Sequence, residues 1–256
     1  FEELTKRPST PEEQKAAQAT VETLFHQLKT VFPPKDVEDF IRIRIGDLLR
    51  CHTNSPGDAL PYYEAVIARP DSPRRFSALM GRADVFARSG DPQMIAKGIE
   101  DYERVIRESG DAGECEFAFY QNIVLWTTRK DYKKAAELAG LYLDQRRSGF
   151  SRFIPQVRLC LARCLDELGM VDEAIQAYSA LVKDLADHTG VSAPAMLGWL
   201  RLMWERNQPG DRDSAREGGR SYLDRTRTLK DRMAADDREL WEEAEEVVNS
   251  FPPRPE

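Results

Sequence analysis

Apolar residues recur at helical spacing along nearly the whole chain. The one strand-like alternation, Ile41-Arg42-Ile43-Arg44-Ile45, lies inside a longer helical pattern that begins at an expected N-cap, Asp36. Gly and Pro interrupt the pattern at regular intervals, as at Ser89-Gly90-Asp91-Pro92, and leave segments of ordinary helix length between them. The pattern therefore predicts an all-α chain of about twelve helices with essentially no sheet.

A short motif repeats along these segments. A small residue is followed four positions later by Tyr, Ala or Gly, and three and four positions after that by a large apolar pair. The five small residues are separated by 39, 37, 39 and 41 positions: Ala59, Gly98, Ala135, Ala174 and Ala215. A small residue lets the second helix of a pair approach its partner closely, and the following aromatic fills the gap to the next layer. The spacing predicts a stack of helix pairs.

One copy resembles the full signature of the tetratricopeptide repeat (TPR) family, with a small residue after leucine, a turn glycine, a packing alanine and a packing aromatic: Leu161-Ala162, Leu165, Gly169, Ala174 and Tyr178. The other copies match in part through Ile45-Gly46, Leu49, Ala59 and Tyr63; Ala83, Phe86, Gly90, Gly98 and Tyr102; Phe119, Ile123, Trp126 and Ala135; and Trp199, Leu202, Gly210 and Ala215. Lys130 replaces one turn glycine, and Arg206 and Gly219 depart from the pattern. The resemblance implies an α-solenoid (superhelix) of about five TPR-like helix pairs over residues 36–228, with repeats longer than the usual 34 residues.

Two further helices are expected at the ends. Thr10-Pro11-Glu12-Glu13 is typical of a capped helix start, and that lead helix should run to about Val31 within residues 1–35. Residues 229–256 should form an acidic C-terminal capping helix and tail with an apolar stripe: Met233, Leu240, Trp241, Ala244, Val247 and Val248. A solenoid needs such caps over its end layers. We expect the three parts to form one structural domain.

The charge of the chain limits the class of partner. The formal net charge is -7, and the segment from Asp231 to Glu256 carries nine acidic and three basic residues. Duplex nucleic acid is disfavoured as the main ligand, since phosphate binding needs a surplus of Lys and Arg. The segment from Arg212 to Arg232 is rich in arginine, and three roles are open for it. It contacts the acidic last helix, or it is a plain solvated surface, or it binds an anionic partner. Of these we favour the first.

No stretch approaches the roughly 20 apolar residues of a membrane-spanning helix. The chain opens with Phe1 rather than Met, so we expect that its native start was removed, with any leader or membrane anchor. The compartment stays open: cytoplasmic, or extracytoplasmic if a leader or anchor preceded Phe1.

The usual enzyme motifs are missing from the sequence, and we expect no catalytic, cofactor-binding or metal-binding residues. The four cysteines show no metal-binding spacing, and we interpret them as small buried side chains. His26, His52 and His188 are interpreted as surface or cap histidines. Gly218-Gly219 is interpreted as a defect or kink in its helix.

The resemblance to the TPR family implies a binding groove, because in that family the first helices of successive pairs line a concave surface that grips peptides. The repeat register places eight residues on this lining: Met80, Asp84, Phe117, Tyr120, Val124, Arg163, Leu200 and Trp204. Tyr120 and Trp204 are equally compatible with packing between layers. The opposite charges of Asp84 and Arg163 could fix the direction of a bound segment.

We therefore predict a non-enzymatic protein-interaction scaffold that holds a partner peptide or helix in the groove. The alternative is a helical-repeat protein that binds RNA, which needs a basic groove with repeated polar base-readers.

Overall fold

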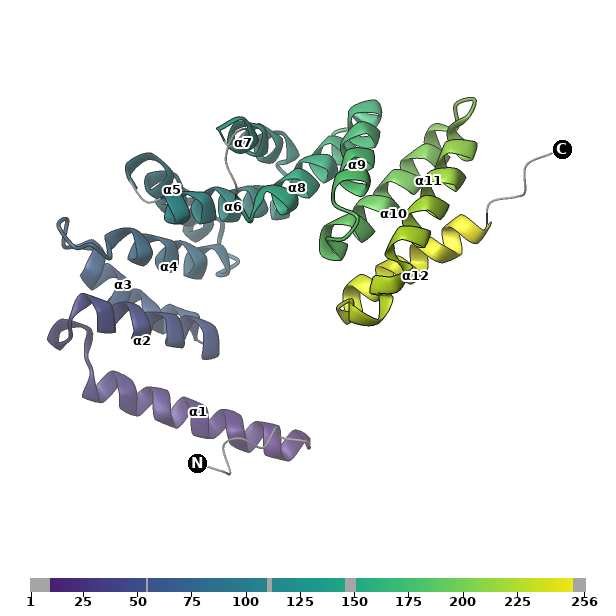
Figure 1. Cartoon of the computed structure of the whole chain (residues 1–256). Coiled ribbons are helices and arrows are strands. Elements are labelled where there is room, and N and C mark those ends of the chain that lie inside the picture. Colours follow the sequence, from purple (N-terminus) through teal and green to yellow (C-terminus); the bar gives the residue numbers. More distant parts are fainter. Residues whose placement is uncertain (1–9, 54, 110–111, 146–150, 251–256) are drawn as a thin grey trace. The chain divides into compact units, whose positions relative to one another are not determined.

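The computed structural model describes residues 10–53, 55–109, 112–145 and 151–250 (Figure 1). These residues form twelve α-helices and three short 3-10 helices, and they contain no strand. The prediction of an all-α chain of about twelve helices is confirmed. The α-helices are α1 Pro11–Val31, α2 Asp39–His52, α3 Leu60–Ile67, α4 Arg75–Ala87, α5 Pro92–Glu108, α6 Ala112–Thr128, α7 Tyr132–Gln145, α8 Ile154–Glu167, α9 Val171–Asp184, α10 Thr189–Arg206, α11 Asp211–Thr226 and α12 Ala235–Ser250.

The helices group into two compact units, Phe1–Ala118 and Phe119–Glu256. In the first unit α2 packs on α3, α3 on α4, and α4 on α5. The core of this unit contains Ile45, Leu49, Ala59, Tyr62, Tyr63, Val66, Ala78 and Val85. The ring of Tyr63 sits so close to two first-helix glycines that an added Cβ would lie 2.8 Å from it at Gly46 and 2.4 Å at Gly81. These two glycines therefore make room for the aromatic of the repeat.

The second unit continues the same arrangement. Helix α7 packs on α8, α8 on α9, α9 on α10, and α10 on α11, while α12 packs on both α10 and α11. One continuous core runs through α8 to α12 and includes Leu159, Ala174, Tyr178, Leu181, Met196, Leu200, Tyr222 and Trp241. Tyr178 meets a glycine as Tyr63 does: a Cβ at Gly198 would lie 2.7 Å from its ring.

The repeat register is confirmed by burial. All five small residues of the motif are buried: Ala59, Gly98, Ala135, Ala174 and Ala215. The residues four positions later are buried as well: Tyr63, Tyr102, Ala139, Tyr178 and Gly219. The first member of each large apolar pair is also buried: Val66, Val105, Tyr142, Leu181 and Tyr222. A period read from residue types thus corresponds to one buried face on each second helix.

Four of the turns between paired helices contain a residue in the left-handed region, whereas the described residues between α2 and α3 contain none. Gly90, Gly169 and Gly210 have φ values of 75°, 73° and 89°, in the left-handed region that glycine adopts without strain. Lys130, which stands in place of a turn glycine, has φ 62° and so keeps the same conformation. The amide of Asp131 donates to the carbonyl of Trp126, just as that of Met170 donates to Leu165. The hydrogen bonds therefore specify the turn, and Lys130 adopts a positive φ despite the backbone strain that this causes in a residue with a side chain.

One local prediction is corrected by the structure, and the glycine pair of α11 has a packing role. Asp36 is not the N-cap of α2: it lies in a 3-10 turn, Pro34–Asp36, and α2 begins at Asp39 after Glu38. Gly218-Gly219 lies inside α11, which is one continuous helix from Asp211 to Thr226. These glycines admit large neighbours: an added Cβ would lie 2.5 Å from the Trp199 ring at Gly218 and 2.4 Å from Val248 at Gly219.

The predicted end helices are present. Helix α1 spans Pro11–Val31, as expected, although the side chain of Glu13 lies outside what the structure describes. In α12, Trp241, Ala244 and Val248 are buried, and Met233 just before the helix is also buried. The apolar stripe of the acidic helix therefore faces α10 and α11.

Candidate functional site

Three of the eight predicted groove residues lie in the first unit. Met80 and Asp84 are on α4 and Phe117 is on α6, and all three are partly buried. The carboxylate of Asp84 accepts a hydrogen bond from Arg50, and Arg88 lies 3.9 Å from it. Two neighbouring guanidinium groups thus neutralise Asp84, which weakens its use as a free negative charge for orienting a ligand.

Three others lie on α6 and α8 in the second unit. Tyr120 is partly buried and stacks on Phe153, with ring centroids 5.0 Å apart and planes 16° from parallel. Burial raises the pKa of the Tyr120 hydroxyl. Val124 is partly buried and Arg163 is exposed. Tyr120 therefore packs against another aromatic, as one of the two interpretations predicts, while Arg163 is exposed to solvent.

The remaining two, Leu200 and Trp204, lie one turn apart on α10 but differ in exposure. Leu200 is 1% exposed and belongs to the core, whereas Trp204 is 46% exposed. The guanidinium carbon of Arg212, from α11, lies 4.5 Å from the centre of the Trp204 ring. A cation over one face of the indole holds the ring in place at the surface. Trp204 is therefore an aromatic that solvent reaches and that has a cation over one face.

A pocket of about 470 Å³ opens beside Trp204, between α10 and α12. We call it the Trp204 pocket; it is lined by Leu197, Gly198, Leu200, Arg201, Trp204, Glu205, Glu243, Val247 and Ser250. Its walls combine apolar surface from both helices with three charged side chains. Such a mixture suits one apolar side chain of a ligand with polar groups at its edge.

The charged groups of the Trp204 pocket are unequally paired. Arg201 donates to Asp166 of α8, and its other guanidinium nitrogen lies 3.1 Å from Glu205. Asp166 also accepts a hydrogen bond from the buried Tyr178 hydroxyl, at 3.3 Å. Two carboxylates thus neutralise Arg201 and fix its stem along the pocket. Glu243 is exposed on the opposite wall, so the rim carries more negative than positive charge.

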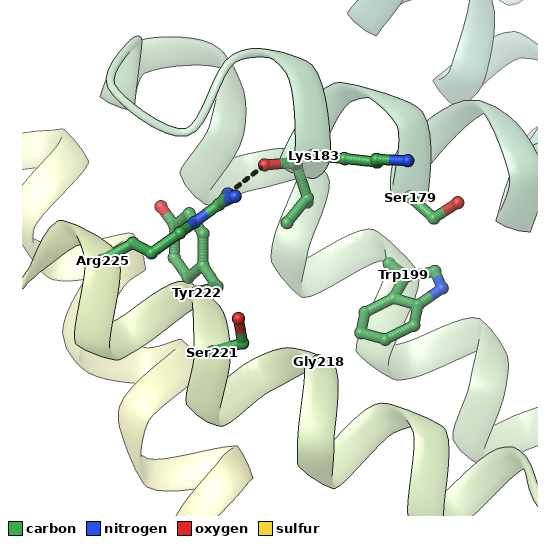
Figure 2. Close-up of a pocket in the computed structure, with 8 residues that line it drawn as sticks. Ser179, Lys183, Trp199, Gly218, Ser221, Tyr222 and Arg225 are labelled. Carbon is green, nitrogen blue, oxygen red and sulfur yellow. Dashed lines mark hydrogen bonds between the residues drawn. The ribbon is translucent and has the colours of Figure 1, made fainter.

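A smaller pocket of about 190 Å³ lies between α9, α10 and α11 (Figure 2). Its lining includes Lys183, Trp199, Gly218, Ser221 and Arg225. Arg225 donates to the main-chain carbonyl of Val182 at 2.8 Å, drawn as the dashed line in Figure 2. That carbonyl lies in the last turn of α9, where cations stabilise the helix end. The positive charge of Arg225 therefore stabilises the end of α9.

The arginine-rich segment makes several different contacts. Arg216 pairs with Asp213 at 2.6 Å, Arg212 covers Trp204, and Arg225 caps α9. Contact with the acidic last helix comes from Lys230, whose amine lies 3.1 Å from Glu242 and 3.8 Å from Glu245. The favoured interpretation thus holds for Lys230, while the arginines named here pair within their own segment or with α9 and α10.

The residues considered for chemistry are dispersed. His26, His52 and His188 are exposed, as interpreted from the sequence. The four cysteines form no disulfide bond: Cys164 is buried and Cys115 and Cys160 are partly buried, but Cys51 is exposed, which corrects the interpretation of all four as buried. Within the described part of the chain, no three His, Cys, Asp or Glu side chains are placed to hold a metal ion. No helix there is long and apolar enough to cross a membrane.

Comparisons with known proteins bear on this architecture. A family model of the tetratricopeptide repeat matches residues 53–94, which hold α3 and α4. The matched segment is therefore a tetratricopeptide repeat. Among solved structures, it is similar to the crystal structure of YrrB, described as a TPR protein with an unusual peptide-binding site. The two share 17% sequence identity at a TM-score of 0.53, over 87% of this chain and 97% of YrrB. No curated protein sequence matches the chain.

The TPR fold implies a protein-interaction scaffold, a class that is generally non-enzymatic. The repeat register found Leu200 and Trp204 of the pocket but missed Arg201, Glu205 and Glu243. For Arg201 a signal existed in the sequence, since it lies three residues before Trp204 on the same helix face. For Glu243 on α12 the sequence contained no such signal, because the repeat register ends with α11 and does not predict how the last helix packs.

Proposed function

We propose that this TPR protein is a non-enzymatic scaffold that holds a peptide or helix of a partner protein against the first helices of its repeats. The Trp204 pocket receives one apolar side chain of that partner. The observation that carries this proposal is the exposed indole of Trp204 beside a pocket whose lining includes Leu197, Leu200 and Val247. Tryptophan and arginine are the residues that most often dominate binding energy in protein interfaces.

The charge of the pocket supports a protein partner over RNA. Glu205 and Glu243 stand at its rim, and Arg201 is neutralised by Asp166 and Glu205. Phosphate groups would be repelled there, and affinity for a nucleic acid would require a surplus of cations. The resemblance to a peptide-binding TPR structure points the same way, as a likeness of fold.

A peptide-display selection tests the proposal without a known partner. Peptides selected on the immobilised full chain are remade with a fluorophore, and their dissociation constants are measured by fluorescence polarisation. Trp204→Ala should weaken the selected peptides tenfold or more, which is about 1.4 kcal/mol. Because Trp204 is a surface residue, 46% exposed and outside the core cluster, its replacement should leave the melting temperature within a few degrees of wild type.

Leu141→Ala is the matched control, since Leu141 is a large apolar residue with 49% exposure on α7, a second helix. It should bind the selected peptides like wild type. Equal weakening by Leu141→Ala and Trp204→Ala would indicate non-specific adhesion to apolar surface. Unchanged affinity in Trp204→Ala would place the binding site elsewhere, and the proposal would fail.

A further inference from the structure

The Trp204 pocket lies at one end of a row of side chains on α10. Gly190, Pro194, Leu197, Arg201 and Trp204 are spaced three or four residues apart, so they share one face of the helix. From Gly190 to Trp204 the helix rises about 21 Å, at 1.5 Å per residue. A ligand that follows this row past the apolar pocket therefore reaches the beginning of α10.

A second pocket, of about 600 Å³, lies at that beginning. We call it the aspartate pocket; its lining includes Asp184, Asp187, His188, Gly190 and Asp237. Asp184 pairs with Arg158 at 2.9 Å, and Asp237 accepts a hydrogen bond from the Thr189 hydroxyl at 3.3 Å. Asp187 is exposed. With three carboxylates and one paired arginine, this end of the row is negative.

Helix α12 adds negative charge along the same path. Asp236, Glu239 and Glu243 are all exposed and lie three or four residues apart, which places them on one face with Val247 and Ser250 of the Trp204 pocket. The only basic residue of α12, Arg238, directs a guanidinium nitrogen to the main-chain carbonyl of Asp231. The surface between the two pockets is thus flanked by unshielded carboxylates.

We propose that the occupant of this surface is a basic segment of a partner protein, with an apolar residue in the Trp204 pocket and a Lys or Arg in the aspartate pocket. An extended chain advances about 3.4 Å per residue, so 21 Å corresponds to a separation of about six residues. Charge complementarity along α10 and α12 selects this occupant over a neutral or acidic one. The inference rests on the proposed function, whose pocket it shares, and adds the chemistry of the partner.

The selected peptides test the apolar residue in the Trp204 pocket and the basic residue in the aspartate pocket separately. Their sequences should be enriched in Lys or Arg about six positions from an apolar residue. Replacing that basic residue by Glu in the synthetic peptide should weaken binding tenfold or more. Moving the Lys to two positions from the apolar residue should also weaken binding measurably, but less than the Glu substitution does. In the protein, Asp187→Asn and Glu243→Gln should each weaken binding about two- to fivefold, as expected for exposed charge pairs.

Glu217→Gln on α11 is the control, because Glu217 is exposed and lines neither pocket. It should leave affinity unchanged. Raising the salt concentration should weaken the wild-type complex and should have a smaller effect on the Asp187→Asn, Glu243→Gln double variant. Thermal melts of all variants should match wild type.

Two results would overturn the inference while the proposed function stands: selected peptides that depend on Trp204 but are neutral or acidic, or basic peptides whose affinity ignores Asp187 and Glu243. Peptides that bind without dependence on Trp204 would contradict the proposed function and the inference together. Self-association in sedimentation experiments that Trp204→Ala abolishes would make a second copy of the chain the occupant, and the basic partner would be wrong.

Discussion

The first and last α-helices of this helical-repeat protein have similar sequence patterns but very different attachments. Helix α12 buries Trp241, with 1% exposure, along with Ala244 and Val248. Among the side chains described in α1, none is buried, and Leu24 and Val31 are 52% and 65% exposed. An amphipathic stripe is therefore not sufficient for burial. What decides is whether the neighbouring helices offer a surface that the stripe fits.

That surface is prepared in different ways for the two helices. At the C-terminal end Gly219 of α11 leaves space for Val248, and the indole nitrogen of Trp241 donates to the buried Thr226 hydroxyl at 2.7 Å. Helix α1 is held by partly buried Phe25 and Leu28 and by a surface ion pair between Lys29 and Asp58. The first attachment is core packing, and the second is a peripheral contact that contributes little.

The largest expected effect is from Trp241→Ala. Removing a fully buried indole leaves a cavity and deletes the hydrogen bond that the Thr226 hydroxyl accepts, although that hydroxyl still donates to the Tyr222 carbonyl. The change should lower the free energy of unfolding by about 3–5 kcal/mol. Urea denaturation followed by circular dichroism would measure it. Trp241→Phe keeps most of the apolar volume and should cost clearly less. A loss of under about 1 kcal/mol in Trp241→Ala would show that α12 is no better attached than α1.

Gly219→Ala should have an intermediate effect. Its Cβ would lie 2.4 Å from Val248, so α12 must shift, at a cost of about 1–3 kcal/mol. Gly140→Ala on α7 is the matched control, because a Cβ there meets nothing within 4 Å. It should be neutral or stabilising, by up to about 1 kcal/mol from helix propensity. If thermal melts gave equal shifts in melting temperature for the two variants, close packing would not explain the attachment of α12.

The smallest effect is expected at the other end. Leu24→Ala on α1 removes apolar atoms that water already reaches, so the free energy of unfolding should change by no more than about 0.5 kcal/mol. Phe25→Ala, one residue on, removes a side chain that packs partly on the core of the first unit and should cost more. Equal and large losses for both would mean that α1 is buried to the same depth as α12.

The fold was largely predictable because each repeat carries its own packing motif. Ala59, Gly98, Ala135, Ala174 and Ala215 mark buried faces by residue type alone. Even Lys130, which breaks the motif, adopts the left-handed turn, because the hydrogen bonds of the neighbouring residues specify it. The start of α2 was misplaced because Asp36, an acceptable N-cap by type, is taken up in a preceding 3-10 turn.

The candidate site was less predictable because it depends on pairings between distant residues. The register names Asp84 as a groove residue but does not show that Arg50, 34 residues earlier, neutralises it. In the same way Arg201 and Asp166 are 35 residues apart and meet only because α8 and α10 come together in the fold. The pocket itself requires α12, which stands outside the repeat.

The ring of Tyr63 in the first unit has a consequence for how these repeats can evolve. It touches the positions of two glycines, Gly46 and Gly81, that belong to successive repeats 35 residues apart. A methyl group at either position would collide with the ring unless the ring shifted or became smaller. Among homologous sequences, substitutions at these three positions should therefore occur together, and a repeat could not be duplicated or exchanged without carrying the glycine that its neighbour's tyrosine requires.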